Sequence, residues 1–184
     1  KDEEKELQEQ IDHMHAINYG IQKIERLPGN IGYLDFRGFG PTGLVAPSLA
    51  AAMQLLSASE ALIIDLRNNR GGSPDTVAFL VSYFTEAGVH LNDIVIRAEN
   101  RITQKWSWPA TPTPRYDAKK KVYVLTSSKT FSAAEDFSYT MQALKRSTTI
   151  GEVTGGGAHP VSGERLGEHL MGMVPFGRSI NPIT

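Results

Sequence analysis

The chain has 184 residues, of which 40% are hydrophobic and 21% charged, and its formal net charge at pH 7 is −1. These values exclude a disordered or fibrous protein, and the balanced charge gives no support for binding to nucleic acid or to an anionic membrane. Cysteine is absent and no H-E-x-x-H pair occurs, so disulfides and thiol chemistry are excluded and we expect neither a metal ion nor another cofactor.

The first predicted element is a charged helix within residues 1–18. Leu7, Ile11 and Met14 recur at spacings of four and three and give it a narrow apolar stripe, which indicates packing against a neighbour. We expect this helix to be a separate unit or the remnant of an upstream helical domain. Residues 19–184 are then expected to form one core that is truncated at its C-terminus.

A predicted hairpin and the first strand of an α/β layer come next. Residues 19–27 and 31–36 are strand-like and are joined by the turn Pro28-Gly29-Asn30. Residues 44–59 are rich in Ala, Leu and Met and predict a helix. The short apolar run at 61–66 is typical of a strand that is covered on both faces.

The second half of the chain continues this alternation of strands and helices. Ser73 supplies an N-cap and Pro74 a first helical position for a helix that ends near Phe84. The remaining predicted elements are strands over 94–106, 121–125, 148–150 and 166–175, a proline-rich loop over 109–114 and a helix over 131–145. The pattern predicts an α/β fold with a mostly parallel sheet.

Three polar or glycine-rich segments follow predicted strands, at the places where α/β folds bind ligands. The first segment, residues 65–72 (DLRNNRGG), ends in Gly71 and Gly72. Glycine amides in such a turn can approach a ligand closely and can form part of an oxyanion hole. Spacing alone favours an ordinary strand-to-helix turn.

The second segment, residues 126–135 (TSSKTFSAAE), joins a strand to a helix. Ser132 would hold its hydroxyl at the mouth of the sheet, and the Ala133 amide at the helix N-terminus would be free to donate to an oxyanion. Ser132 and Glu135 also match a capping box, which has only a structural role. The pattern alone favours capping, and Ser127 and Ser128 compete with Ser132 for either role.

The third segment, residues 151–160 (GEVTGGGAHP), contains three successive glycines and then His159. A histidine there is a candidate general base. A lone histidine before proline is more often a surface loop residue, and the spacing favours that interpretation.

Together and in this order, the segments resemble the S41 family of serine peptidases, which includes the C-terminal processing peptidases and the modules of interphotoreceptor retinoid-binding protein. The resemblance covers residues 17–184, and the tail is most similar to the retinoid-binding-protein branch. The matching stretches are Gly32-Tyr33-Leu34 with Phe36, Ile64 to Asn69 with Gly71-Gly72, Thr130 to Glu135, Gly151 with Thr154-Gly155-Gly156, and Val174 to Pro182.

The resemblance implies a crotonase/ClpP-like α/β core and a serine endopeptidase that acts on peptide or protein substrates. It implies that Ser132 forms an acyl-enzyme and that the Ala133 amide, with an amide from Gly71 or Gly72, holds the oxyanion. It also implies a periplasmic, cell-envelope or secreted location. A homo-oligomer remains open.

One departure from the family concerns the general base. The processing peptidases use a lysine at the position that Gly157 holds here, and no lysine follows Lys145. His159, oriented by Glu135, is the local candidate for the base, and a base outside the chain is the alternative.

A second function class stays open because of this departure. A non-catalytic module of the same fold, binding an apolar small ligand such as a retinoid or a fatty acid, would need no base. An acyl-CoA enzyme of the crotonase type would share the oxyanion hole, but no adenine-binding signal supports it. The peptidase is our leading hypothesis, because Ser132, Glu135 and the glycine segment are all retained.

Overall fold

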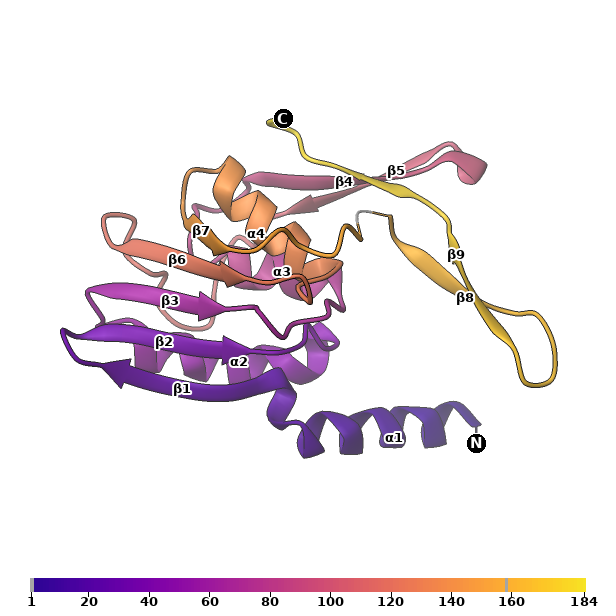
Figure 1. Ribbon diagram of the computed structural model, residues 1–184, viewed down its shortest axis with the longest axis horizontal. Helices are drawn as coiled ribbons and strands as arrows, with labels where there is room; N and C mark the ends of the chain where they lie inside the picture. The colour runs from indigo at the N-terminus through magenta and orange to yellow at the C-terminus, as the bar shows by residue number, and fades with distance from the viewer. Residues whose placement is uncertain (1, 158) are drawn as a thin grey trace.

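A five-stranded, mostly parallel sheet is the centre of the computed structural model, which describes residues 2–157 and 159–184 (Figure 1). In spatial order its strands are β1 (Ile21–Leu27), β2 (Ile31–Phe36), β3 (Ala61–Asp65), β6 (Lys121–Thr126) and β7 (Thr148–Gly151). Strand β1 is antiparallel to β2, and the other neighbours are parallel. The predicted α/β fold and the predicted N-terminal hairpin are confirmed.

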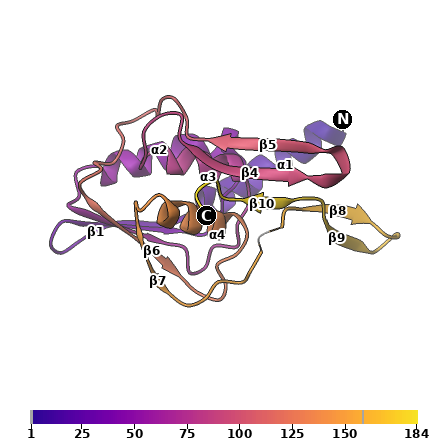
Figure 2. The same cartoon turned by 90° about the horizontal axis from the view of Figure 1, so that it is seen from above.

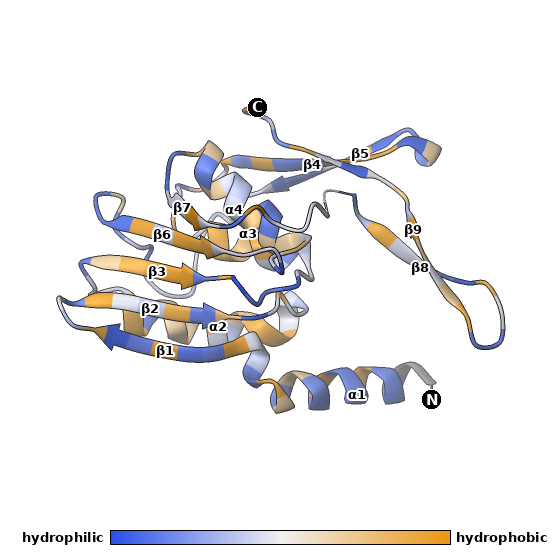
Figure 3. Cartoon of the chain, in the orientation of Figure 1, coloured by the Kyte–Doolittle hydropathy of each residue, from blue (hydrophilic) through white to orange (hydrophobic). Residues whose placement is uncertain are grey.

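Three helices cover one face of this sheet and separate it from a second, smaller sheet (Figure 2). They are α2 (Thr42–Leu56), α3 (Pro74–Val81) and α4 (Ala133–Ala143). Leu34, Ile64 and Val124 are aligned across neighbouring strands and are fully buried in the core that includes the helices. Figure 3 shows β3 as a mostly hydrophobic strand.

On the other face of the large sheet, no helix of the described part of the chain lies over the strands (Figure 1). Ile63 of β3 and its register partners Tyr33 and Tyr123 are only half-buried there. The prediction that residues 61–66 are covered on both faces was therefore wrong for this face. An apolar run does not reveal this difference, because an isoleucine such as Ile63 can occupy a half-buried position as well as a fully buried one.

The second sheet contains β4 (His90–Ile96), β5 (Arg101–Trp106) and β10 (Arg178–Ile180), in the order β10-β4-β5. The prediction of one strand over 94–106 was wrong, because the chain turns between β4 and β5. Asn100 adopts a left-handed φ of 45° at that turn, a conformation that asparagine tolerates better than most residues.

A two-stranded hairpin, β8 (Val161–Arg165) and β9 (Met171–Pro175), projects from the body of the molecule (Figure 1). The prediction of a strand over 166–175 holds only for its second half, since residues 166–170 form the turn of this hairpin.

The N-terminal helix α1 (Asp2–Ala16) also projects from the sheet (Figure 1). Of its apolar stripe only Met14 is buried, whereas Leu7 is 54% exposed. The packing predicted for the stripe is therefore limited to the C-terminal end of the helix. None of the helices within the described residues has the length and apolar character needed to cross a membrane.

A glycine at the end of β7 provides a test of the fold. Gly151 has φ of +135°, and a Cβ there would overlap the carbonyl oxygen of Thr126. We expect Gly151→Ala to lower the free energy of unfolding by at least about 2 kcal/mol, measured by denaturant titration. Gly43→Ala in α2 is the matched control, because nothing lies within 4 Å of the added methyl group. Equal stability of the two variants would contradict this account.

Candidate active site

The three segments selected from the sequence meet at one edge of the large sheet. They follow β3, β6 and β7, which are adjacent and parallel, so their carboxyl ends lie at the same edge. The predicted gathering of these segments is thus a consequence of strand order.

Ser132 occupies an unusual backbone conformation at the start of α4. Its φ is 53° and its ψ is −121°, outside the regions that side-chain-bearing residues ordinarily populate. Such a conformation costs about 1–3 kcal/mol and persists only where the surroundings enforce it. Here the Phe131 amide donates to the Asn69 carbonyl at 3.1 Å, which anchors the residue before Ser132.

The glycine turn after β3 packs directly against Ser132. Gly71 has φ of +97°, and a Cβ on it would lie 2.7 Å from the Ser132 Cβ and 2.9 Å from the Ala133 nitrogen. Only glycine permits so close an approach in this conformation. The structure therefore brings together the turn and the helix start.

A fully buried asparagine fixes the turn in this position. Asn69 Nδ2 donates to the Phe36 carbonyl at 3.0 Å, and Asn69 Oδ1 accepts from the Gly71 amide at 2.8 Å. The Gly71 amide is therefore already used. The amides of Gly72 and Ala133 donate to no described residue, and both residues line the same cavity as Ser132.

Glu135 ties the third segment to the start of α4. Its carboxylate accepts from the Ser132 amide at 2.7 Å, the Thr154 hydroxyl at 2.6 Å and the amides of Gly156 and Gly157 at 2.7 Å each. Burial alone would raise the pKa of Glu135, but these hydrogen bonds outweigh it and lower the pKa below its ordinary value. With Ser132, Glu135 forms the predicted capping box.

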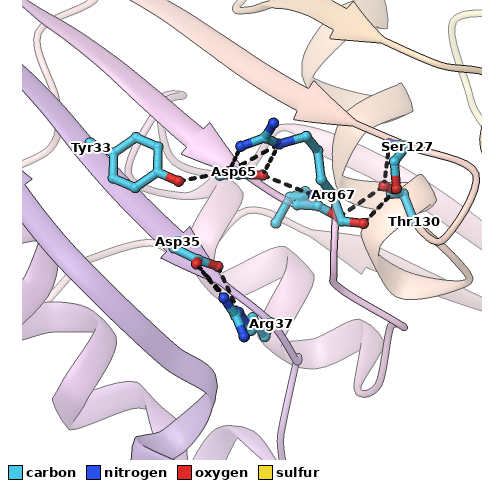
Figure 4. Close-up of polar contacts among 8 residues, drawn as sticks. Tyr33, Asp35, Arg37, Asp65, Arg67, Ser127 and Thr130 are labelled. Atoms are coloured by element: carbon cyan, nitrogen blue, oxygen red, sulfur yellow. Dashed lines mark hydrogen bonds and ion pairs between the residues drawn. The ribbon is translucent and has the colours of Figure 1, made fainter.

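A cluster of hydrogen-bonded polar side chains lies on the uncovered face of the sheet and holds the first residues of the turn after β3 (Figure 4). Arg67 forms a bidentate ion pair with the buried Asp65, which also accepts from the Tyr33 hydroxyl at 2.7 Å. Burial and the bond to Asp65 raise the pKa of Tyr33 to about 12. Burial alone would raise the pKa of Asp65, but the hydrogen bonds from Arg67 and Tyr33 outweigh it and lower that pKa.

Two hydroxyl groups connect this cluster to the segment before Ser132. Ser127 Oγ donates to the Arg67 carbonyl at 2.5 Å, and Thr130 Oγ1 donates to the Leu66 carbonyl at 2.8 Å (Figure 4). The Ser127 hydroxyl is therefore occupied by a hydrogen bond that links two segments of the fold. Sequence reasoning missed Thr130 and Asn69 as positioning residues, because their partners are distant in the chain.

A cavity of about 960 Å³ opens beside Ser132. Its lining includes three carboxylates, those of Glu135, Asp136 and Glu152, and within the described residues it includes no Lys, Arg or His side chain. Its apolar wall is formed by Ile94, Val153, Val161, Phe176 and Ile180, together with smaller groups.

His159 is not brought into contact with Ser132. It is exposed and does not belong to the cavity lining, although Gly157 and Pro160 on either side of it do. Gly157 also packs on the ring of Phe131, where an added Cβ would lie 2.5 Å from the ring. A side chain at position 157 would therefore require the Phe131 ring to shift. The described residues contain no group of potential metal ligands.

Comparison with known proteins identifies the family. The model of peptidase family S41 matches residues 30–182. Similar solved structures include a candidate S41 protease from Bacteroides fragilis NCTC 9343, with a TM-score of 0.75 and 21% identity over 88% of this chain and 46% of that chain. For the photosystem II D1 C-terminal processing protease the TM-score is 0.64, with 22% identity over 85% and 40%. For a lipoprotein from Streptococcus agalactiae the TM-score is 0.65, with 17% identity over 87% of this chain and 59% of that chain.

The hydrogen bonds of Glu135 predict a pH-dependent contribution to stability. We expect Glu135→Gln to lower the free energy of unfolding by about 1–3 kcal/mol at pH 7, because a neutral amide cannot accept all four bonds. Since the folded-state pKa is lowered, this contribution is complete above the unfolded pKa of about 4.3 and disappears as the pH falls through the folded value. Urea titration between pH 2 and pH 7 measures it.

The exposed Glu60 provides the control for this experiment, as Glu60→Gln. We expect that variant to match the unsubstituted protein throughout the range. A loss in Glu135→Gln that is the same at pH 2 and pH 7 would contradict the role given to the ionised carboxylate.

Proposed function

The chain belongs to peptidase family S41, and from that premise we propose that it carries the nucleophile of a serine endopeptidase, Ser132. It spans about half the length of the solved relatives it matches. The observation that carries the proposal is the strained Ser132 at a helix N-terminus, in contact with a glycine turn and open to a large cavity. Two amides without a partner among the described residues, those of Ala133 and Gly72, belong to residues that line the same cavity as Ser132.

These groups support acyl transfer. Ser132 Oγ attacks the carbonyl carbon of a peptide bond and forms a C–O bond, while its proton passes to a base. The carbonyl oxygen takes the electron pair and is held by the amides of Ala133 and Gly72. Collapse of this intermediate breaks the C–N bond, and the amine leaves with the proton from the base. Water then hydrolyses the ester and restores Ser132.

Glu135 acts in this proposal as a positioning residue. Its four hydrogen bonds hold the Ser132 amide and the 154–157 segment together, and they occupy both carboxylate oxygens. It is therefore poorly placed to accept the serine proton. We assign the base to His159, which precedes Pro160 of the cavity lining and follows Gly157 of the same lining by two positions. Because His159 is exposed and outside the lining, this role requires the imidazole to move to Ser132.

Location and partners follow from the same proposal. The substrate is a peptide or a protein. A relative with this fold is described as a lipoprotein, which supports assignment of this protein to the cell envelope or the exterior.

A second candidate function is supported by the cavity wall. Its apolar side chains and the absence of lysine and histidine from its described lining suit a module that binds a fatty acid or a retinoid without catalysis. Saturable binding of a fluorescent fatty acid, unaffected by Ser132→Ala and accompanied by no peptide cleavage, would favour this function over the peptidase.

The nucleophile can be tested with a fluorophosphonate probe on the intact protein. We expect labelling of the unsubstituted protein and none of Ser132→Ala, because the probe reacts with an activated serine hydroxyl. Ser128→Ala is the matched control, since Ser128 lies in the same segment and is exposed. Equal labelling of all three proteins would remove the nucleophilic role from Ser132.

The base can be tested through the rate of the same reaction. Removal of a general base typically slows a reaction by a factor of about 10²–10⁴. We therefore expect His159→Ala to slow labelling at neutral pH by at least about 100-fold. His169→Ala, which removes another exposed histidine, should label at the unsubstituted rate. An unchanged rate in His159→Ala would show that a different residue accepts the proton.

A further inference from the structure

One carboxylate of the cavity is only partly used by the protein. Asp136 lies one helical turn after Ser132 and lines the same cavity. Its Oδ1 accepts from Asn92 Nδ2 at 2.9 Å and from Thr140 Oγ1 at 3.3 Å. Its Oδ2 accepts from no described residue, and the residue is half-buried. This second oxygen is therefore available to a ligand in the cavity.

The other two carboxylates of the lining are less suited to pair with a ligand. Both oxygens of Glu135 are hydrogen-bonded, whereas Glu152 is exposed, so that water screens its charge, and its Oε2 accepts from the Ser128 amide at 2.9 Å. No cationic side chain among the described residues belongs to the lining. The charge of Asp136 is thus not balanced inside the cavity, and burial accordingly raises the pKa of this carboxyl, opposed by the bonds from Asn92 and Thr140.

Asp136 is held rigidly, as a recognition group needs to be. Asn92, which is 4% exposed, donates to Asp136 and accepts from the Ser179 hydroxyl at 2.8 Å. This chain of bonds joins α4, β4 and β10. Because Asp136 is fixed by three elements, little conformational entropy is lost when a partner binds its free oxygen.

The cavity wall suits the stem of a long basic side chain. Ile94, Phe176 and Ile180 supply apolar surface to the same cavity that Asp136 and Asn92 line. Lysine and arginine combine a hydrocarbon stem with a charged end, and such side chains bury the stem while the end finds a polar partner. A purely aliphatic side chain would leave the Asp136 charge unpaired and partly desolvated.

We propose that the cavity beside Ser132 is a specificity pocket for a lysine or arginine side chain of the substrate, paired with Asp136 Oδ2. The inference rests on the proposed peptidase function and adds the substrate class to it. The residue recognised is one that borders the bond attacked by Ser132, since Asp136 lies four positions after Ser132, on the same side of the start of α4.

Two matched peptides test the proposal on the intact protein. Both are internally quenched alanine peptides, one with a single arginine and one with norleucine at the same position. We expect kcat/KM to be at least about tenfold higher for the arginine peptide, as expected for a desolvated charge pair. Mass spectrometry should place the cleaved bond next to the arginine.

The variant Asp136→Asn should lose this preference while it still cleaves the norleucine peptide. Asp93→Asn is the matched control, because Asp93 follows Asn92 on β4 but pairs with His90 and does not line the cavity. It should keep the full preference. Melting curves establish that each variant is folded, and Asp136→Glu, which keeps the charge, should recover part of the preference where Asp136→Asn is unstable.

Binding of the same peptides, measured by fluorescence anisotropy with Ser132→Ala, separates this inference from the proposed function. Tighter binding of the arginine peptide with no cleavage by any form of the protein would sustain the pocket and overturn the peptidase. Cleavage of both peptides at equal rates would sustain the peptidase and overturn the pocket. An arginine preference that persists in Asp136→Asn would likewise overturn the role of Asp136.

Discussion

The close approach of the turn after β3 to the start of α4 is the constraint on which the site depends. At Gly71 the two segments are so near that a single methyl group would meet both Ser132 and the Ala133 amide. Asn69 maintains this approach from the inside, because its buried side chain joins the turn to β2 while its carbonyl accepts from Phe131. Both ends of the junction are therefore tied to the parallel sheet, and the sheet determines where the Ser132 hydroxyl lies.

Glu135 provides a second constraint, because its carboxylate does more than cap a helix. A carboxylate at the third position of a helix is a common cap, and its charge is favourable near the positive end of the helix. Here the same carboxylate also accepts from Thr154, Gly156 and Gly157. The cap therefore draws the segment after β7 onto the start of α4 and closes one side of the cavity. One set of hydrogen bonds therefore both caps the helix and positions the segment after β7.

The sequence predicted those features that depend on neighbours along the chain. The apolar runs of β3 and β6, the N-terminal hairpin and the Ser132–Glu135 capping box are local patterns, and each was recovered. The features that were missed depend on contacts across long stretches of chain. The Asn69 side chain donates a hydrogen bond to the carbonyl of Phe36, which is 33 positions away in the chain. The Asp136 carboxylate accepts one from Asn92, which is 44 positions away.

Turns inside strand-like segments were missed for a related reason. The β4–β5 and β8–β9 hairpins contain neither the Asn-Gly nor the Asp-Gly turn that reports a hairpin most clearly. These hairpins are defined by the pairing of their strands, and the sequence pattern alone does not show which residues pair.

The charge of the cavity bears on which base could serve Ser132. Three carboxylates line it, and a negative field raises the pKa of any cationic group placed nearby. A lysine in that field would be held protonated, and an imidazole would be shifted in the same direction. The field would stabilise the imidazolium that forms when a histidine accepts the serine proton, but it would also favour that protonated form before the reaction. In the proposed peptidase an acidic lining is therefore better matched to a cationic side chain of the substrate, which gains a charge partner there, than to a cationic base, which must give up its proton.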